Sequence, residues 1–145
     1  KNKALLISAT GTGKTYLSTF DALNVNPKRL LFIVHRANIA KKALKTYQTI
    51  FKNDKTFGLY SGQSRDFESD YIFSTIQTLS RENHLAKFAP DAFDYIVIDE
   101  THRASASSYQ KILDHFTPKF LLGMTATPER TDDSDVFEIF DHNIA

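Results

Sequence analysis

The sequence predicts a doubly wound α/β domain, in which helices cover both faces of a mostly parallel central sheet. Short apolar runs alternate with helical patterns along the whole chain, and this rhythm is typical of such folds. Several runs are apolar throughout rather than at every second position, as strands buried on both faces require. The 145 residues suit one domain, so we expect residues 1–145 to form a single unit.

The apolar runs give the expected strands and the 3.6-residue periods give the expected helices. Leu17, Phe20 and Leu23 form one stripe, and a second helix is expected from Ala37. The segment 81–94 has no such pattern, and we interpret it as a surface excursion. The strands are expected at Ala4–Ile7, Leu30–Val34, Phe57–Tyr60, Tyr71–Ser74, Tyr95–Ile98 and Phe120–Met124. The remaining helical stripes are Ala40, Ala43, Leu44, Tyr47 and Phe51, and then Tyr109, Ile112, Leu113 and Phe116 after a cap at Ser107 or Ser108.

Composition excludes several classes of protein. The 12 Phe and 6 Tyr supply enough bulky core material to exclude intrinsic disorder. Because the chain has no apolar run of 18 residues or more, we expect no membrane span. The absence of cysteine excludes disulfide scaffolds and thiolate metal sites, and it favours a reducing, cytoplasmic location. The net charge of +1 neither indicates nor excludes a nucleic-acid partner.

A phosphate-binding loop is predicted between the first strand and the first helix. The segment 8–15 reads SATGTGKT, and its glycines let successive backbone amides face one anion at a helix N-terminus. Lys14 is expected to reach the β- and γ-phosphates of ATP, and the Thr15 hydroxyl to bind Mg²⁺. Ser8 stands where the strict pattern has a first glycine, and the alternative is a simple Gly/Thr-rich turn. The expected cofactor-binding residues are Ser8, Thr10, Gly11, Thr12, Gly13, Lys14 and Thr15.

Two adjacent carboxylates end the strand that begins at Tyr95. Neighbouring strand residues point to opposite sides, so Asp99 and Glu100 cannot share one role. We expect Asp99 to hold Mg²⁺ and Glu100 to orient the water that attacks the γ-phosphate, with His102 assisting. An acidic turn that caps a helix is the alternative for the pair, and a surface histidine is the alternative for His102.

These blocks together resemble the first RecA-like domain of superfamily 2 helicases and translocases, of the DEAD/DEAH-like kind. Segment 8–15 is similar to motif I, segment 34–36 to motif Ia, segment 99–102 to a D-E-x-H box, and segment 125–128 to motif III. The segment 74–79 is similar to the T-x-x-x-L region of the family. The subgroup most resembled is that of restriction-enzyme and repair translocases.

The resemblance implies a three-layer RecA-like fold and a nucleic-acid-dependent ATPase that uses ATP and Mg²⁺. It implies nucleic-acid contacts for Arg36, Thr75 and Gln77, with DNA favoured over RNA. It assigns Thr125 and Thr127 to the coupling of ATP state to domain movement. The alternative for Arg36 is a solvated arginine, and that for Thr75 and Gln77 is a polar helix cap. The alternative for Thr125 and Thr127 is a hydrogen-bonded turn. We interpret Lys41, Lys42 and Lys45 as a solvated helix face.

The family also uses a second RecA-like domain, which supplies arginine fingers and does not fit in 145 residues. We therefore expect the 145 residues alone to hydrolyse ATP very slowly. Two rival functions stay open at this point: a P-loop ATPase or kinase acting on a substrate other than nucleic acid, and a scaffold without catalysis.

Overall fold

One seven-stranded sheet forms the centre of the computed structural model, which describes residues 2–7, 11–61, 64–66, 68–99 and 106–125. The strand order is β1-β7-β6-β2-β5-β3-β4, so consecutive strands are often not neighbours. The strands are β1 (Asn2–Ile7), β2 (Leu30–Val34), β3 (Phe57–Ser61), β4 (Ser64–Arg65), β5 (Tyr71–Thr75), β6 (Tyr95–Asp99) and β7 (Phe120–Thr125). All six predicted strands are present within a residue or two, and the two-residue β4 is the addition.

The pairing confirms the mostly parallel sheet that the sequence predicts. The pairs β1–β7, β7–β6, β6–β2, β2–β5 and β5–β3 are parallel, and only the short β3–β4 pair is antiparallel among the strands described. Parallel neighbours need a crossover connection, which here runs through the helices. The carboxyl ends of six adjacent strands, from β1 to β3 in the sheet order, therefore lie along one edge.

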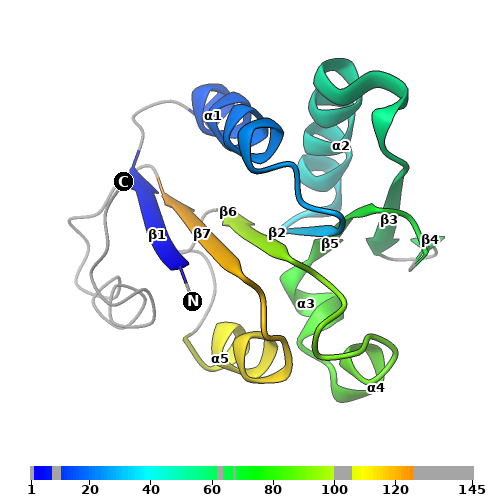
Figure 1. Ribbon diagram of the computed structural model, residues 1–145. Coiled ribbons are helices and arrows are strands. Elements are labelled where there is room, and N and C mark those ends of the chain that lie inside the picture. The colour runs from blue at the N-terminus through cyan, green and yellow to red at the C-terminus, as the bar shows by residue number, and fades with distance from the viewer. Residues whose placement is uncertain (1, 8–10, 62–63, 67, 100–105, 126–145) are drawn as a thin grey trace.

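Helices cover both faces and complete three layers (Figure 1). On one face lie α1 (Gly11–Val25) and α2 (Ala37–Phe51), which is followed by a short 3₁₀ turn, η1 (Lys52–Asp54). On the other face lie α3 (Ile76–Leu79), α4 (Glu82–Leu85) and α5 (Ala106–His115). Among the described residues, no helix is both long and apolar enough to cross a membrane.

The two faces of β2 explain why its sequence is apolar throughout. Leu30, Phe32 and Val34 pack in a cluster with α1 and α2, whereas Leu31 and Ile33 pack in a cluster with α3 to α5. All five side chains are at most 1% exposed. A strand buried on both sides has no position left for a polar residue.

The segment 81–94 is more than the surface excursion that the sequence suggests. It forms the one-turn helix α4, and Leu85, Phe88 and Phe93 from it are buried against β6 and α5. The aromatic rings of Phe88, Phe93 and Phe116 contact one another, with centroids 5.5 to 6.2 Å apart. The prediction was wrong because three apolar residues without a period give no helical or strand signal.

The caps proposed for the last helix were also wrong. Because α5 begins at Ala106, Ser107 and Ser108 lie inside its first turn rather than before it. The helix ends at His115, ahead of Thr117 and Pro118, because proline cannot continue a helix. Similarly α1 ends at Val25, and Asn26 adopts a left-handed φ of 52° while its N–H donates to the Ala22 carbonyl at 2.7 Å.

The largest correction concerns the face that α1 presents to the sheet. Leu17, Phe20 and Leu23, which the sequence assigns to the core, are 51%, 52% and 43% exposed. Over residues 16–25 of this helix, whose side chains the structure describes, the buried residues are instead Ser18, Thr19 and Ala22. Over residues 16–25 the helix therefore turns a mostly polar side inward, and its predicted apolar stripe faces outward.

Candidate nucleotide and nucleic-acid edge

The predicted motifs lie at the carboxyl ends of five neighbouring strands. Reading across the sheet, β1 leads into motif I, β7 into motif III and β6 into the acidic pair. Next come β2, which leads into motif Ia, and β5, which leads into the T-x-x-x-L region. Ligands of open α/β sheets bind at this edge. The motifs associated with ATP thus occupy three adjacent strands, and those associated with nucleic acid occupy the next two.

The strand register shows how close the ends of β1, β7 and β6, which lead into the ATP-associated motifs, lie to one another. Ile7 at the end of β1 pairs with Thr125 of β7, and the neighbouring Met124 pairs with Asp99 at the end of β6. Only β7 separates β1 from β6, so their ends lie two strand spacings apart, about 10 Å. That span is comparable to an extended triphosphate, and β7 brings Thr125 between the two ends.

The helix α1 begins at this edge and supplies a positive end. It starts at Gly11, so Gly11, Thr12 and Gly13 are already helical and precede Lys14 within the first turn. The N-terminus of a helix of 15 residues carries unpaired N–H groups and about half a positive charge. A phosphate group fits this position.

Of the predicted acidic pair, Asp99 is the residue that the structure describes. Its neighbours Tyr95 and Val97 belong to the cluster under α1 and α2, whereas Ile96 and Ile98 belong to the opposite cluster. By the same alternation the Asp99 side chain lies on the α1 face, and it is only 6% exposed. A carboxylate at this place has the hard oxygen donors that Mg²⁺ prefers, so the donor chemistry fits a magnesium–nucleotide complex.

Several predicted site residues lie outside what the structure describes. Of Lys14, Thr15 and Thr125 the backbone is described, in α1 and β7, but the side chains are not. Their predicted roles therefore stay predictions. The residues wholly outside the described ranges are Ser8, Thr10, Glu100, His102 and Thr127.

On the nucleic-acid side, two of the three predicted residues reach solvent. Arg36 is exposed and extended, with φ −139° and ψ 143°, immediately before α2. Gln77 is exposed in the first turn of α3. Thr75 is 6% exposed and its hydroxyl donates to the Thr78 hydroxyl at 2.9 Å. The polar cap that we kept as an alternative for Thr75 is thus partly realised, because Thr75 occupies the N-cap position but bonds a side chain.

The lysine face of α2 matches its prediction. Lys41, Lys42 and Lys45 are all exposed, on the side of the helix opposite to the buried Tyr47 and Phe51. Long charged side chains on a solvated face contribute little to stability. We assign them no role in the site.

Sequence reasoning missed the residues that hold α1 in place. The Tyr47 and Ser18 hydroxyls are 3.0 Å apart in a buried hydrogen bond, and the Tyr95 hydroxyl donates to the Asp21 carboxylate. Burial raises the pKa of both tyrosines well above the ordinary value, so each hydroxyl keeps its proton. The available signal was the pair Ser18-Thr19 on one side of a helix whose other side is apolar.

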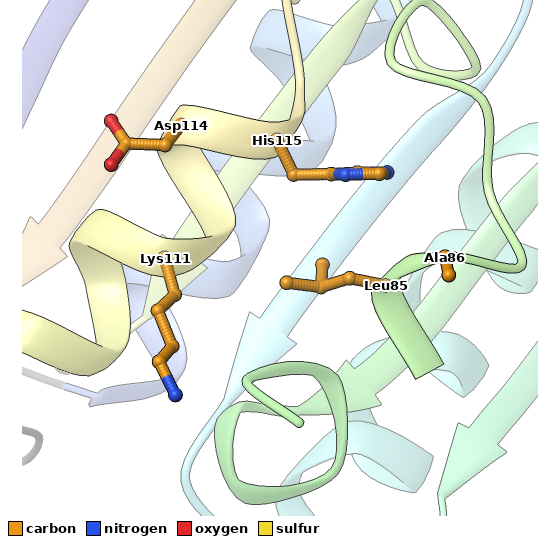
Figure 2. Close-up of a pocket in the computed structure, with 5 residues that line it drawn as sticks. All are labelled: Leu85, Ala86, Lys111, Asp114 and His115. Atoms are coloured by element: carbon orange, nitrogen blue, oxygen red, sulfur yellow. The ribbon is translucent and has the colours of Figure 1, made fainter. Parts of the chain in front are cut away.

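A shallow groove lies elsewhere, between α4 and α5 on the face opposite to α1. Figure 2 shows the His115 ring from α5 and the Leu85 side chain from α4 on its two sides, while Asp114 points away. The His115 Nε2 atom lies 2.7 Å from the Phe88 carbonyl oxygen, to which it donates. This contact ties α5 to the segment after α4. The groove therefore belongs to the packing of that face and holds none of the predicted site residues.

Residues 1–130 match the family described as "Type III restriction enzyme, res subunit". The chain belongs to this family. The family agrees with the helicase-type motor domain that the motifs resemble, and a substrate other than nucleic acid gains no support from it.

A curated relative is the EcoAI endonuclease subunit, a type I restriction enzyme of Escherichia coli. It is 35% identical over 156 residues, which cover 97% of this chain and 18% of the relative. The chain spans about a fifth of the length of the first curated relatives that it matches.

Two solved structures show the same fold. The Hef helicase domain of Pyrococcus furiosus superposes with a TM-score of 0.79 at 19% identity, over 99% of this chain and 34% of that one. The SWI2/SNF2 ATPase core of Sulfolobus solfataricus, solved in complex with dsDNA, gives 0.71 at 23% identity, over 96% and 31%. These likenesses confirm the three-layer α/β fold that the sequence predicts.

Proposed function

We propose that this domain binds ATP with Mg²⁺ at the ends of β1, β7 and β6, and that it couples hydrolysis to movement along DNA at the ends of β2 and β5. One observation carries the proposal: the five motif-bearing strand ends are neighbours, in an order that separates the two ligands. A motor has to bind ATP and DNA close together on the same sheet edge, so that a change in the nucleotide site can alter the DNA contacts.

On the ATP side, phosphoryl transfer depends on positioning and on charge neutralisation. In the proposed site the segment 8–13 surrounds the phosphates with backbone N–H groups, and Lys14 neutralises the β- and γ-oxygens. Thr15 and Asp99 hold Mg²⁺. Glu100 orients the attacking water, and His102 links this centre to Thr125, at the end of the adjacent β7, and to Thr127.

On the nucleic-acid side, the proposed contacts are to phosphate and sugar rather than to base edges. The guanidinium of Arg36 suits phosphate oxygens, and the Gln77 amide suits phosphate or the sugar. Of the three predicted residues, Thr75 contributes least through its side chain, because its hydroxyl bonds Thr78. DNA is supported as the substrate by the solved relative that holds dsDNA.

A second RecA-like domain completes the proposed machine. An arginine finger supplied by such a domain accelerates phosphoryl transfer by about 10³ to 10⁵. We therefore expect the 145 residues alone to bind ATP but to turn it over very slowly, and a longer protein that carries both domains to show ATPase activity stimulated by DNA.

The decisive experiment compares two variants by nucleotide binding and by steady-state ATPase in the two-domain protein. Lys14→Ala is expected to abolish ATP binding, because it removes the charge that faces the phosphates. Glu100→Gln is expected to retain binding and to stop hydrolysis. Lys41→Ala, a lysine on the solvated face of α2, is the matched control and should leave both unchanged.

Equal loss of binding in Lys14→Ala and Glu100→Gln would contradict the separate roles. The rate should rise with double-stranded or single-stranded DNA, and Arg36→Ala should remove much of that stimulation while leaving ATP binding intact. An ATPase whose rate ignores DNA and RNA alike would instead favour a substrate other than nucleic acid.

A further inference from the structure

Helix α1 is held mainly by directed hydrogen bonds and only weakly by apolar packing. Its large apolar side chains are about half exposed, and its buried residues are small or polar. Among the described residues, α1 contacts α2 more than any strand of the sheet. Two tyrosine hydroxyls help to set its place: that of Tyr47 from α2, beside Ser18 and Thr19, and that of Tyr95 from β6, on Asp21.

The Tyr95–Asp21 contact joins the two elements on which the proposed ATP site depends. Asp21 lies seven residues after Lys14, a distance of about 10 Å along the helix. Tyr95 lies four residues before Asp99, a distance of about 13 Å along the strand. The two lengths are similar. A contact at the far end of α1 and β6 therefore sets the offset between the phosphate-loop end of the helix and the acidic end of the strand.

We propose that Tyr95 and Asp21 are positioning residues that hold α1 in register with β6, and so hold the magnesium-binding groups of the two elements at their working distance. This inference rests on the proposed function, because it concerns the same nucleotide site. Neither residue touches the nucleotide. They act through the rigid bodies of the helix and the strand.

The requirement for such a contact follows from the metal. Mg²⁺ demands near-ideal octahedral geometry at 2.0–2.1 Å, so it tolerates little movement between ligands on separate elements. The proposed ligands Thr15 and Asp99 stand on α1 and β6. A helix without strong apolar packing can slide by a fraction of a turn unless a directed bond stops it. Tyr95 is well suited, since it is 1% exposed and its raised pKa keeps its hydroxyl a donor.

The test measures binding of a fluorescent ATP analogue to the 145-residue chain, as a function of Mg²⁺ and again in EDTA. Tyr95→Phe removes only the hydroxyl, and Asp21→Leu replaces the charged acceptor by an apolar side chain of similar size. Both are expected to raise the Mg²⁺ concentration for half-maximal binding about tenfold, the lower end of what loss of a supporting partner costs at metal sites. Binding in EDTA should change little.

Two controls separate positioning from general damage. Asp21→Asn keeps an oxygen acceptor for the Tyr95 hydroxyl and should restore the Mg²⁺ dependence of the parent. Tyr60→Phe removes another buried tyrosine hydroxyl, one that lies 2.8 Å from His84 Nδ1, and should leave the dependence unchanged. Thermal unfolding of each variant establishes the folded fraction; Asp21 is exposed, so its variants keep the core intact.

The outcomes are distinguishable. If the parent chain binds no ATP analogue at any Mg²⁺ concentration, the proposed function itself fails. If the parent binds and both Tyr95→Phe and Asp21→Leu follow the parent curve, the positioning role is refuted. Equal losses in Asp21→Asn and Asp21→Leu would also refute it, because the hydrogen bond would then not be the cause.

Discussion

Helices α1 and α2 have the same length and cover the same face of the sheet, yet they bury opposite kinds of surface. On α2 the apolar stripe Ala40, Ala43, Tyr47 and Phe51 is buried, and the lysines face solvent. On α1 the apolar stripe faces solvent, and Ser18 and Thr19 are buried. The difference teaches that an apolar stripe reports the buried face only where packing alone decides the orientation.

The local environment explains why α1 departs from its pattern. The helix begins at Gly11, only four residues after β1 ends, so the short connection dictates where its first turn points. The tyrosines of α2 and β6 then offer hydroxyl groups that need partners in a buried place. Because an unpaired buried polar group costs about 1–3 kcal/mol, these partners outweigh part of the apolar preference.

The sharpest test of the comparison uses one phenylalanine from each helix. Phe51→Ala in α2 should lower the free energy of unfolding by about 3–5 kcal/mol, because the ring is 2% exposed and packs on Tyr47 and Tyr71. Phe20→Ala in α1 should cost less than about 1 kcal/mol, since the side chain is half exposed. Urea unfolding of both variants measures the difference, and similar losses would mean that α1 buries its stripe after all.

A second test concerns the polar contact between the two helices. Ser18→Ala leaves the buried Tyr47 hydroxyl with one partner fewer and should cost about 1–3 kcal/mol. The double variant Ser18→Ala, Tyr47→Phe should be less destabilised than the sum of the single variants, because neither hydroxyl then lacks the other. Strictly additive losses in a double-mutant cycle would show that the contact carries no energy of its own.

The smallest expected effect is a dependence on alkaline pH. Burial raises the pKa of Tyr47 above its ordinary value of 10.0, so the folded chain keeps this proton where the unfolded chain loses it. The stability that Tyr47 contributes is present below pH 10 and is lost as pH rises. The loss amounts to about 1 kcal/mol between pH 10 and 11.

Tyr47→Phe should remove that part of the alkaline slope, while Tyr60→Phe, for which no such anchoring of α1 exists, serves as the comparison. Urea unfolding at the two pH values measures the slope for each variant. If the free energy of unfolding of Tyr47→Phe falls with pH as steeply as that of the parent, the pKa of Tyr47 is not raised in the folded chain. Other contacts would then hold α1.

The sequence predicted most of the fold because strands buried on both faces of a parallel sheet appear as continuous apolar runs. Runs such as Leu30–Val34 and Tyr95–Ile98 are apolar at every position, and they became the central strands. The motifs follow directly after these strands in the sequence, so the sequence also predicted which strand ends would carry the site residues. What the pattern could not predict was segment 81–94, whose core residues Leu85, Phe88 and Phe93 have no period.

By itself, the sequence determined the class of the sheet, the family, and the residues from which an ATP site could be built. Local composition and motif spacing contain that information, because each strand end and loop is a continuous piece of chain. Only the tertiary structure decided that β7 stands between β1 and β6, and that α1 turns Ser18 inward and contacts β6 through Asp21. The orientation of α1 depends on contacts with Tyr47 and Tyr95, which lie 29 and 74 positions from their partners in the sequence. The periodicity of one helix cannot predict contacts of that kind.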